Sequence, residues 1–354
     1  MIAALDIQVT KTSKSRLSEI DFDHLPFGKH FTDHMLEVDY ADGEWKKVVI
    51  RSFQDLSLSP ALAAIHYGQS IFEGIKAYKD REGRPFIFRP FDNFRRFNLS
   101  AERMNMPVVP EEIFVEGMRR LVELDKDWIP MKSDYSLYIR PFMFASDDII
   151  GVKSSDTYKF MIILSPTGPY YSAPMRIYVE EKYTRAARGG VGFAKAAGNY
   201  GASMLATAEA KRQGYDQVLW TDAFEHKYVQ EIGTMNVFFV IGKKVLTPDL
   251  ESGTILEGVT RDSAIEVLRQ EGYTVEEGSI HIDDVVRAYQ AGELKEVFGT
   301  GTAATISMIK ELKYEDFNIT FDTDTWTVAP TVKRVLTDIR EGRRKDTRGW
   351  MFKV

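Results

Sequence analysis

One segment, residues 189–201, constrains this chain more than any other. It contains five glycines, three alanines and a single lysine, Lys195. A packed helix disfavours this composition, because glycine loses more backbone entropy on folding than any other residue. Glycines also let another group approach the backbone closely, and partial burial makes a lysine amine a better nucleophile by favouring its uncharged form. The segment therefore predicts either a reactive lysine in a hollow lined by backbone or a surface lysine in a flexible loop.

Length and composition exclude several classes of protein and site. The chain has 354 residues, 44% of them hydrophobic, which is enough for two medium-sized cores. The absence of cysteine excludes disulfides, cysteine metal sites and thiolate nucleophiles. The first residues lack a signal-peptide pattern, no apolar run approaches the ~20 residues of a membrane span, and the basic residues are scattered at a net charge of -6. A cytoplasmic protein that binds neither membrane nor nucleic acid is expected.

Strand and helix patterns are mixed without a regular strand–helix–strand repeat, which favours an α+β fold. A small N-terminal α/β domain is expected at 1–165, an interdomain linker at 166–178 and a larger domain at 179–354, because three prolines and a glycine lie in 165–174. The patterns predict strands at 33–52, 71–78, 85–88, 136–142, 160–164, 217–220 and 237–241, and helices at 91–104, 111–125, 202–213, 261–271, 282–291 and 330–340.

A carboxylate and two turns rich in glycine and threonine accompany the lysine. Glu231 precedes a strongly apolar strand, residues 258–260 open a helix, and residues 301–304 permit close backbone approach. Helix N-termini bind anions through backbone N–H groups. Pyridoxal 5'-phosphate needs a Schiff-base lysine, an acidic partner for its ring nitrogen and a phosphate site, so the set suits that cofactor. A solvated glutamate, a helix-capping Thr260 and an ordinary tight turn are the alternatives.

Two further pairs of residues suggest binding sites. Tyr138 and Arg140 alternate along a predicted strand and therefore point to one face, where the arginine can bind a carboxylate through two hydrogen bonds. A structural tyrosine beside a surface arginine is the alternative. His30 and His34 have the spacing of a helical metal pair, but no third ligand lies nearby, so we interpret them as structural and expect no metal.

Together these segments resemble the branched-chain-amino-acid aminotransferases, which are class IV pyridoxal-phosphate enzymes of fold type IV. The resemblance covers most of the chain and implies a two-domain architecture whose larger domain binds the cofactor. It is strongest to the longer subgroup, whose animal members carry a Cys-x-x-Cys pair after the Gly-Thr-Ala turn. Ala304 to Ser307 follow that turn here, so thiol regulation is not expected at this site. The matching segments are 27–35, 72–78, 137–141, 195–201, 217–220, 231–236, 297–303 and 350–352.

The resemblance also implies a role for each matching residue. Lys195 would be the catalytic residue, forming the Schiff base and later moving a proton between the substrate α-carbon and the cofactor. The other implied cofactor-binding residues are Glu231 at the pyridine nitrogen, Tyr200 at the phenolic oxygen, Arg96 (or its neighbour Arg95), Val259, Thr260 and Thr302 at the phosphate, and Thr234. The implied substrate-binding residues are Tyr138, Arg140, Thr234 and Ala303 for carboxyl groups, and Phe31, Tyr67, Phe72 and Tyr170 for an apolar side-chain pocket.

The implied reaction is the reversible transfer of an amino group from L-leucine, L-isoleucine or L-valine to 2-oxoglutarate. It gives the branched 2-oxo acid and L-glutamate, and a homodimer is expected. Burial of an aliphatic side chain is worth roughly 1.5–3 kcal/mol, and one methylene only ~1–3 kcal/mol, so all three amino acids should be accepted. A D-amino-acid aminotransferase or an aminodeoxychorismate lyase of the same fold type, and a noncatalytic binding protein, are the alternatives.

Overall fold

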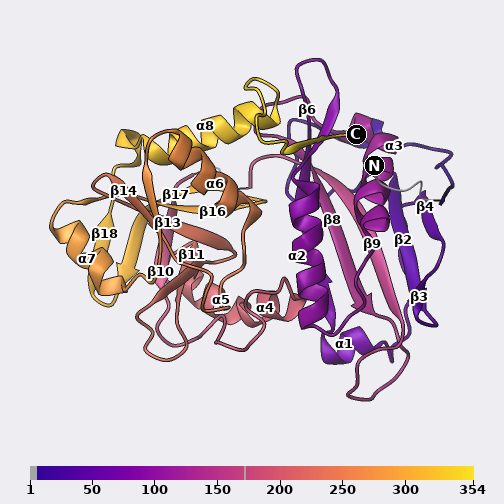
Figure 1. Cartoon of the computed structure of the whole chain (residues 1–354), viewed down its shortest axis with the longest axis horizontal. Coiled ribbons are helices and arrows are strands. Elements are labelled where there is room, and N and C mark those ends of the chain that lie inside the picture. The colour runs from indigo at the N-terminus through magenta and orange to yellow at the C-terminus, as the bar shows by residue number, and fades with distance from the viewer. Residues whose placement is uncertain (1–5, 171–172) are drawn as a thin grey trace. The chain divides into compact units, whose positions relative to one another are not determined.

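The chain forms two units, each built around its own β-sheet (Figure 1). The computed structural model describes residues 6–170 and 173–354. Unit 1 contains the residues up to Tyr170 together with Ala194–Gly198 and Thr337–Val354. Unit 2 contains the remainder, that is, the segment that ends at Phe193 and Asn199–Leu336. Each unit combines a sheet with packed helices, as the predicted α+β class requires.

Unit 1 is organised by a sheet that is antiparallel except for one parallel pair. Its elements are β1 (Ile7–Val9), η1 (Leu17–Glu19), β2 (His34–Ala41), β3 (Glu44–Trp45), β4 (Val48–Ser52), α1 (Ala63–Tyr67), β5 (Ser70–Phe72), β6 (Ile75–Lys79), β7 (Pro85–Phe88), α2 (Pro90–Arg103), η2 (Glu112–Glu116), α3 (Gly117–Leu124), η3 (Lys126–Trp128), β8 (Ser136–Ala145), β9 (Tyr158–Thr167) and β19 (Met351–Lys353). The strand order is β1-β4-β2-β9-β8-β6-β7-β19, with β3 paired to β2 and β5 to β8. The parallel pair is β1 with β4.

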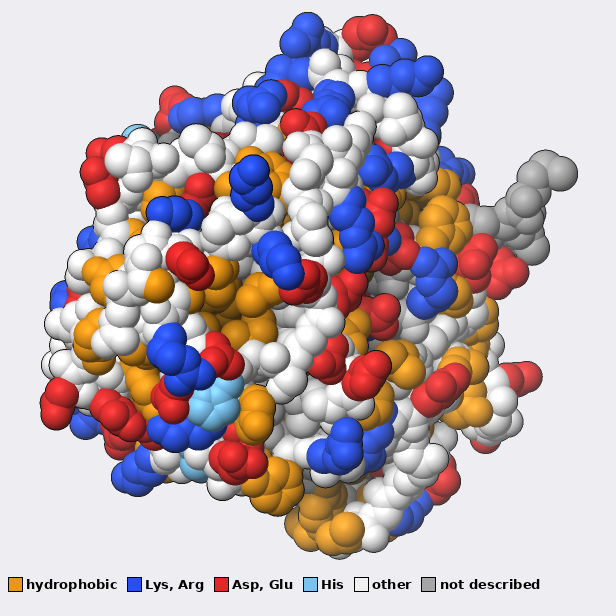
Figure 2. All heavy atoms as spheres, turned by 60° about the vertical axis from the view of Figure 1, so that its left-hand side comes forward, with side chains coloured by type: hydrophobic (Ala, Val, Ile, Leu, Met, Phe, Trp, Pro, Cys, Tyr) orange, Lys and Arg blue, Asp and Glu red, His pale blue; other side chains and the backbone are white. Residues whose placement is uncertain are grey.

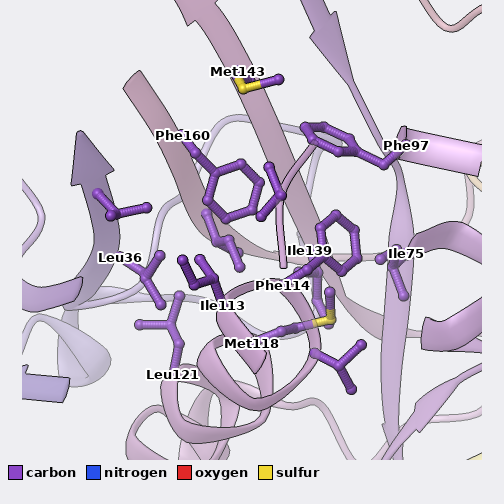
Figure 3. Close-up of a cluster of buried hydrophobic side chains, with 14 of the residues drawn as sticks. Leu36, Ile75, Phe97, Ile113, Phe114, Met118, Leu121, Ile139, Met143 and Phe160 are labelled. Atoms are coloured by element: carbon purple, nitrogen blue, oxygen red, sulfur yellow. The ribbon is translucent and has the colours of Figure 1, made fainter. Parts of the chain in front are cut away.

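A cluster of aromatic and aliphatic side chains anchors α2 to this sheet. Figure 3 shows Phe97 from α2 gathered with Phe114 and Phe160 in the core. The ring centroids of Phe97 lie 5.2 Å from Phe114 and 5.5 Å from Phe160. Full burial of such a side chain contributes roughly 1.5–3 kcal/mol. The cluster therefore holds α2, which carries Arg96 and Ser100, in a fixed position on the sheet.

Unit 2 has a second sheet that mixes parallel and antiparallel pairs. Its elements are β10 (Met175–Val179), α5 (Met204–Arg212), β11 (Gln217–Thr221), β12 (Val229–Ile232), β13 (Met235–Ile241), β14 (Lys244–Thr247), α6 (Val259–Gln270), β15 (Thr274–Glu277), α7 (Ile282–Gln290), β16 (Leu294–Gly301), β17 (Thr305–Tyr314), β18 (Phe317–Thr320) and η4 (Thr323–Thr325), while α4 (Ala197–Ala202) and α8 (Val328–Arg340) each cross a unit boundary. The order is β12-β11-β10-β17-β16-β13-β14-β15, β18 pairs with β17, and β12 also pairs with β13.

The two faces of the β13 region differ in character. Ile282 and Val285 of α7 join a buried cluster with Val237 and Phe239. Because side chains alternate along a strand, Asn236 points to the opposite face. On that face Asn236 lies opposite Glu231, where the sequence predicted a site.

Charged side chains of both signs lie on the face that Figure 2 displays. Figure 2 shows acidic and basic side chains intermixed on the displayed face, in keeping with the scattered basic residues of the sequence. A nucleic-acid site favours a concentrated basic patch or stripe instead. Among the described residues, no helix is both long and apolar enough to cross a membrane.

The structure corrects three predicted boundaries. The expected strand 71–78 is two strands, β5 and β6, which are interrupted at the fully buried Glu73 and at Gly74. The expected helix 111–125 begins with the wider π-type turn η2 before α3. The expected linker 166–178 overlaps the flanking strands, because β9 continues through Thr167 and β10 begins at Met175; residues 171 and 172 lie outside the described residues.

The division into units also differs from the predicted large domain at 179–354. The segment Ala194–Gly198 groups with unit 1, where Ala196 forms an isolated β-bridge with Ile71. The C-terminal segment Thr337–Val354 groups with unit 1 as well, because β19 pairs with β7.

Candidate active site

Lys195 lies in the segment of unit 1 that is held between α2 and β5. Its backbone N–H donates to Ser100 Oγ at 2.9 Å, and its carbonyl accepts from the Phe72 N–H at 3.1 Å. Its half-buried side chain places Nζ 4.8 Å from the centroid of the Phe72 ring. This geometry favours the interpretation of a positioned amine over that of a lysine in a flexible loop.

Tyr138 and Arg140 project from one face of β8, where the arginine lies over the ring of Phe72. Arg140 Nη2 donates to the Tyr138 hydroxyl at 3.0 Å, and the guanidinium lies 4.5 Å from the centroid of Phe72. Gly74 makes room for the tyrosine, since a Cβ there would overlap its hydroxyl. Arg140 Nε is buried and has no hydrogen-bond partner among the described residues. An amine and a guanidinium with an unsatisfied donor therefore share the Phe72 ring.

Tyr170 reaches this group through a residue that the sequence analysis did not single out. The ring of Phe27 lies 4.8 Å from Tyr138 and 5.0 Å from Tyr170, with an edge-on geometry in both contacts. Tyr170 itself is largely exposed. Phe27 thus links Tyr170, one of the residues predicted to line the apolar side-chain pocket, to Tyr138 and Arg140.

Phe31 and Tyr67, which were also predicted to line the apolar side-chain pocket, lie in different surroundings. Phe31 stacks on Phe53 with a centroid separation of 4.9 Å. Tyr67 is exposed at the end of α1. Their assignment to the side-chain pocket stays a prediction.

Of the two adjacent arginines, Arg96 is the internal one. Its side chain is 6% exposed and faces the buried carboxylate of Glu73, with Nε–Oε1 and Nη2–Oε2 distances of 2.7 and 2.8 Å. The side chain of Arg95 is 67% exposed and pairs with Asp92. The Arg96 carbonyl also accepts from Ser100 Oγ, the group that binds the Lys195 backbone, at 3.0 Å. This placement favours Arg96 over Arg95 for the implied phosphate role, which stays a prediction.

In unit 2, three polar residues form a row across three strands. Glu231 on β12 pairs with Asn236 on β13, which in turn pairs with Thr300 on β16. Directly opposed residues of antiparallel strands project from the same face, so the three side chains lie side by side. Glu231 is buried, and the buried Thr300 Oγ1 has no hydrogen-bond partner among the described residues. The sequence analysis identified Glu231 but missed Asn236 and Thr300.

The loop that leads into α6 is tied to this row. The Leu256 N–H donates to Glu231 Oε1 at 2.7 Å, and its carbonyl accepts from Asn236 Nδ2 at 2.9 Å. Gly258 occupies the N-cap, where a Cβ would overlap Asn236 Oδ1. The interpretation of Thr260 as a helix cap is therefore wrong: it is the second residue of α6, and its side chain is buried. The first turn, with Val259 and Thr260, provides backbone N–H groups suited to an anion.

The remaining predicted residues of unit 2 lie in two neighbouring turns. Thr234 is exposed in the turn between β12 and β13, and Thr302 and Ala303 lie half-buried in the turn between β16 and β17. The pairing of Asn236 with Thr300 brings both turns to the same end of the sheet. A Cβ placed on Gly301 would lie 3.8 Å from the Thr234 carbonyl oxygen.

Tyr200 lies on the short helix α4, where it is half-buried. Its carbonyl accepts from Ser203 Oγ at 2.8 Å. The neighbouring Asn199 Nδ2 donates to the Val191 carbonyl at 2.9 Å, which ties together the two ends of the segment that carries Lys195. The segment is thus constrained from within its own loop.

His34 lies on strand β2, so the helical spacing with His30 does not form. Its Nδ1 lies 2.6 Å from a carboxylate oxygen of Asp125, and its Nε2 accepts from the Thr12 N–H at 2.9 Å. Both ring nitrogens contact other parts of unit 1, as expected for a structural histidine.

Comparison with known proteins places the chain in a family. A family model described as Amino-transferase class IV matches residues 70–312. The chain is a class IV aminotransferase. It is 48% identical over 360 residues to a probable branched-chain-amino-acid aminotransferase of Staphylococcus aureus (strain MRSA252), covering 100% of this chain and 99% of the relative. It is also 48% identical to branched-chain-amino-acid transaminase 1 of Bacillus subtilis (strain 168), covering 93% and 94%.

Solved structures resemble this class IV aminotransferase over most of its length. The branched-chain aminotransferase of Thermoproteus uzoniensis with norvaline gives a TM-score of 0.73 at 26% identity and covers 90% of this chain and 99% of that one. The T.th. branched-chain amino acid aminotransferase complexed with N-(5'-phosphopyridoxyl)-L-glutamate gives 0.72 at 28% identity and covers 89% and 98%. The α+β architecture with two units is accordingly that of fold-type IV aminotransferases.

Proposed function

We propose that the chain is a branched-chain-amino-acid transaminase that uses pyridoxal 5'-phosphate. It transfers the amino group of L-leucine, L-isoleucine or L-valine to 2-oxoglutarate and yields the branched 2-oxo acid and L-glutamate. The observation that carries this proposal is the grouping of Lys195 with Phe72, Tyr138 and Arg140, in a chain 48% identical over its full length to a probable branched-chain-amino-acid aminotransferase.

The residues present fit the cofactor. Lys195 is a half-buried amine, Glu231 is a buried carboxylate, and the first turn of α6 offers backbone N–H groups. The buried hydroxyl of Thr300, which lacks a partner among the described residues, suits a polar ligand group beside Glu231. The related T.th. enzyme has been solved with pyridoxamine 5'-phosphate. These observations support pyridoxal 5'-phosphate as the cofactor of this chain.

Each residue then has a distinct task in the reaction. The cofactor supplies an aldehyde that links to amines and a pyridine ring that accepts electron density from the substrate. Glu231 would bind the ring nitrogen and keep it protonated, and Tyr200 would donate to the phenolic oxygen. Arg96, Thr302 and the backbone of Val259 and Thr260 would hold the phosphate. Lys195 Nζ would carry the proton between the substrate α-carbon and C4′ of the cofactor.

One site must recognise both the aliphatic side chain of a branched-chain substrate and the acidic side chain of glutamate or 2-oxoglutarate. Phe72 and Tyr170 provide apolar surface for an aliphatic side chain. The buried Arg140 Nε and the Tyr138 hydroxyl provide donors for a carboxylate of 2-oxoglutarate or glutamate. Thr234 and Ala303 hold the other carboxylate through their backbone. This division explains how an acidic and a branched substrate can alternate in one reaction.

A homodimer is part of the proposal. Unit 1 exposes an apolar patch made of Ile65 on α1 and Ile149, Ile150 and Val152 in the loop between β8 and β9. The Ala63 N–H donates to the Asp147 carbonyl at 2.8 Å, which holds this loop against α1. Contiguous exposed apolar side chains mark interaction sites, and a second copy of the chain is the partner proposed here.

The absorbance spectrum of the purified protein tests the function. Wild type, reconstituted with pyridoxal 5'-phosphate, should show a visible band that L-leucine removes and D-alanine does not. K195A should lack the lysine-linked band and lose turnover. Exchange of label between glutamate and the branched 2-oxo acids should accompany the spectral change.

Other outcomes of these measurements would favour a different activity or exclude catalysis. A response to D-alanine alone would favour a D-amino-acid aminotransferase, and release of pyruvate from aminodeoxychorismate would favour the lyase. A wild-type protein that shows no band with excess cofactor would exclude catalysis of this type.

A further inference from the structure

Arg185 connects three segments of unit 2 through one guanidinium. Its Nε lies 3.1 Å from Glu231 Oε2. Its Nη1 donates to the Thr254 carbonyl at 2.7 Å, and its Nη2 donates to the Gly192 carbonyl at 3.2 Å. The side chain is 7% exposed, so these contacts form away from water. The sequence analysis did not single out Arg185.

The three contacted segments are those that carry the proposed cofactor groups. Glu231 is the partner of the ring nitrogen, and Gly192 stands three residues before Lys195 in the chain. Thr254 lies in the loop that leads to the first turn of α6. That loop packs closely on the segment before the lysine, since a Cβ on Gly192 would lie 2.5 Å from the Thr254 carbonyl oxygen. One side chain therefore couples the position of all three.

The carboxylate of Glu231 is held from two sides. Oε1 accepts from the Leu256 N–H at 2.7 Å, and Oε2 faces Arg185. A carboxylate buried without a positive partner favours its neutral, protonated form, whereas an adjacent guanidinium favours the charged form. Only the charged form can keep a pyridine nitrogen protonated.

We propose that Arg185 is a positioning residue of the transaminase, which keeps Glu231 charged and oriented toward the cofactor ring and fixes the loops before Lys195 and α6. The inference rests on the proposed function. Arg185 acts through Glu231 and the two loops and touches neither substrate nor reacting atoms. A lysine cannot replace it fully, because an ammonium is a point charge whereas the planar guanidinium reaches several acceptors at once.

Cofactor affinity is the first measurement. Apoenzyme of wild type, R185K and R185Q is titrated with pyridoxal 5'-phosphate and followed by absorbance. R185Q should bind the cofactor about 10- to 100-fold more weakly, because a hydrogen bond to a charged group is worth ~1.5–3 kcal/mol. R185K keeps the charge and should recover part of this loss. R261K is the matched control, because Arg261 is equally buried and binds Pro248 and Glu277 instead of Glu231.

The pH dependence of the visible band separates positioning from simple structural support. Loss of a buried positive charge favours protonated forms of nearby groups, so the midpoint of the band should rise in R185Q and stay near that of wild type in R185K and R261K. If Arg185 acts through Glu231, adding R185Q to E231Q should change the midpoint little. Two independent effects would instead add.

The outcomes distinguish the two proposals. Suppose that wild type shows the band and that R185Q matches wild type in cofactor affinity and in the pH midpoint of the band. The proposed role of Arg185 would then be overturned, and the proposed function would stand. Additive effects of R185Q and E231Q would also overturn the role of Arg185. A wild-type protein without a band would overturn the proposed function, and the role of Arg185 with it.

Discussion

The guanidinium of Arg96 and the carboxylate of Glu73 form a buried ion pair with two parallel contacts, of 2.7 and 2.8 Å. The second carboxylate oxygen also accepts from the Gly74 N–H at 3.1 Å. Arg96 lies on α2 and Glu73 between β5 and β6, so the pair joins a helix to the sheet that it covers. It also fixes the plane of the arginine proposed to bind the cofactor phosphate.

Replacement of Glu73 by glutamine should destabilise the protein strongly. E73Q leaves the Arg96 charge buried without its counter-ion, and breaking a buried pair typically costs about 3–5 kcal/mol. Urea unfolding without added cofactor measures the change in the free energy of unfolding. E82Q is the control, because Glu82 pairs with Arg84 at the surface, where such a pair is worth about 0–1 kcal/mol. Equal stability of E73Q and E82Q would contradict the structural importance of this pair.

The sequence was most informative where local patterns determine structure. The helix expected at 91–104 is α2, and the helix expected at 261–271 is α6. Alternation along β8 correctly placed Tyr138 and Arg140 on one face, because the two-residue period of a strand is a local property.

Contacts between distant segments were not predictable in the same way. The row of Glu231, Asn236 and Thr300 depends on the register of three strands, and one slip would turn each side chain to the other face. Arg185 stands 46 positions before Glu231, and nothing in the local pattern pairs them. The grouping of the C-terminal segment with unit 1 was unpredictable for a related reason, because β19 joins the first sheet by a pairing that local composition does not encode.

Gly258 should tolerate no side chain. In G258A the new Cβ would overlap Asn236 Oδ1 and lie 3.0 Å from Arg261 Cβ, so the start of α6 or the Asn236 side chain must shift. We expect a loss of about 1–3 kcal/mol of stability from overpacking and a weaker affinity for pyridoxal 5'-phosphate. Thermal unfolding and cofactor titration measure the two effects. G278A is the control, because a Cβ at Gly278 meets no atom within 4 Å; matching results for both variants would show that the close approach is unimportant.

Lys76 should make stability depend on pH. It is buried on β6 opposite Tyr138. Burial lowers its pKa from 10.5 to about 7, with a further decrease from Arg340 and an opposing effect of Asp134. The unfolded chain therefore binds more protons between these values, so the free energy of unfolding should rise with pH by up to about 1.4 kcal/mol per unit.

The comparison of wild type with K76M isolates this dependence. Methionine keeps the length of the side chain and removes the titrating amine. Urea unfolding from about pH 7 to pH 10 should show that the free energy of unfolding of wild type, relative to that of K76M, increases as pH rises. K47M, at a largely exposed lysine, should parallel wild type. Parallel curves for K76M and wild type would mean that Lys76 keeps its ordinary proton affinity in the folded protein.

The apolar patch on unit 1 predicts where the proposed dimer can be broken. Ile150 and Val152 are 72% and 91% exposed, which leaves their apolar surface in water unless a second copy covers it. I150E should change the stability of a monomer by only ~0.5 kcal/mol, as is usual at the surface, yet burying its charge in an apolar interface is costly. Light scattering during size-exclusion chromatography should therefore give a dimer mass for wild type and a monomer mass for I150E. F224E, at an 82% exposed side chain of unit 2, should remain dimeric. A dimer of I150E as stable as that of wild type would place the subunit interface elsewhere.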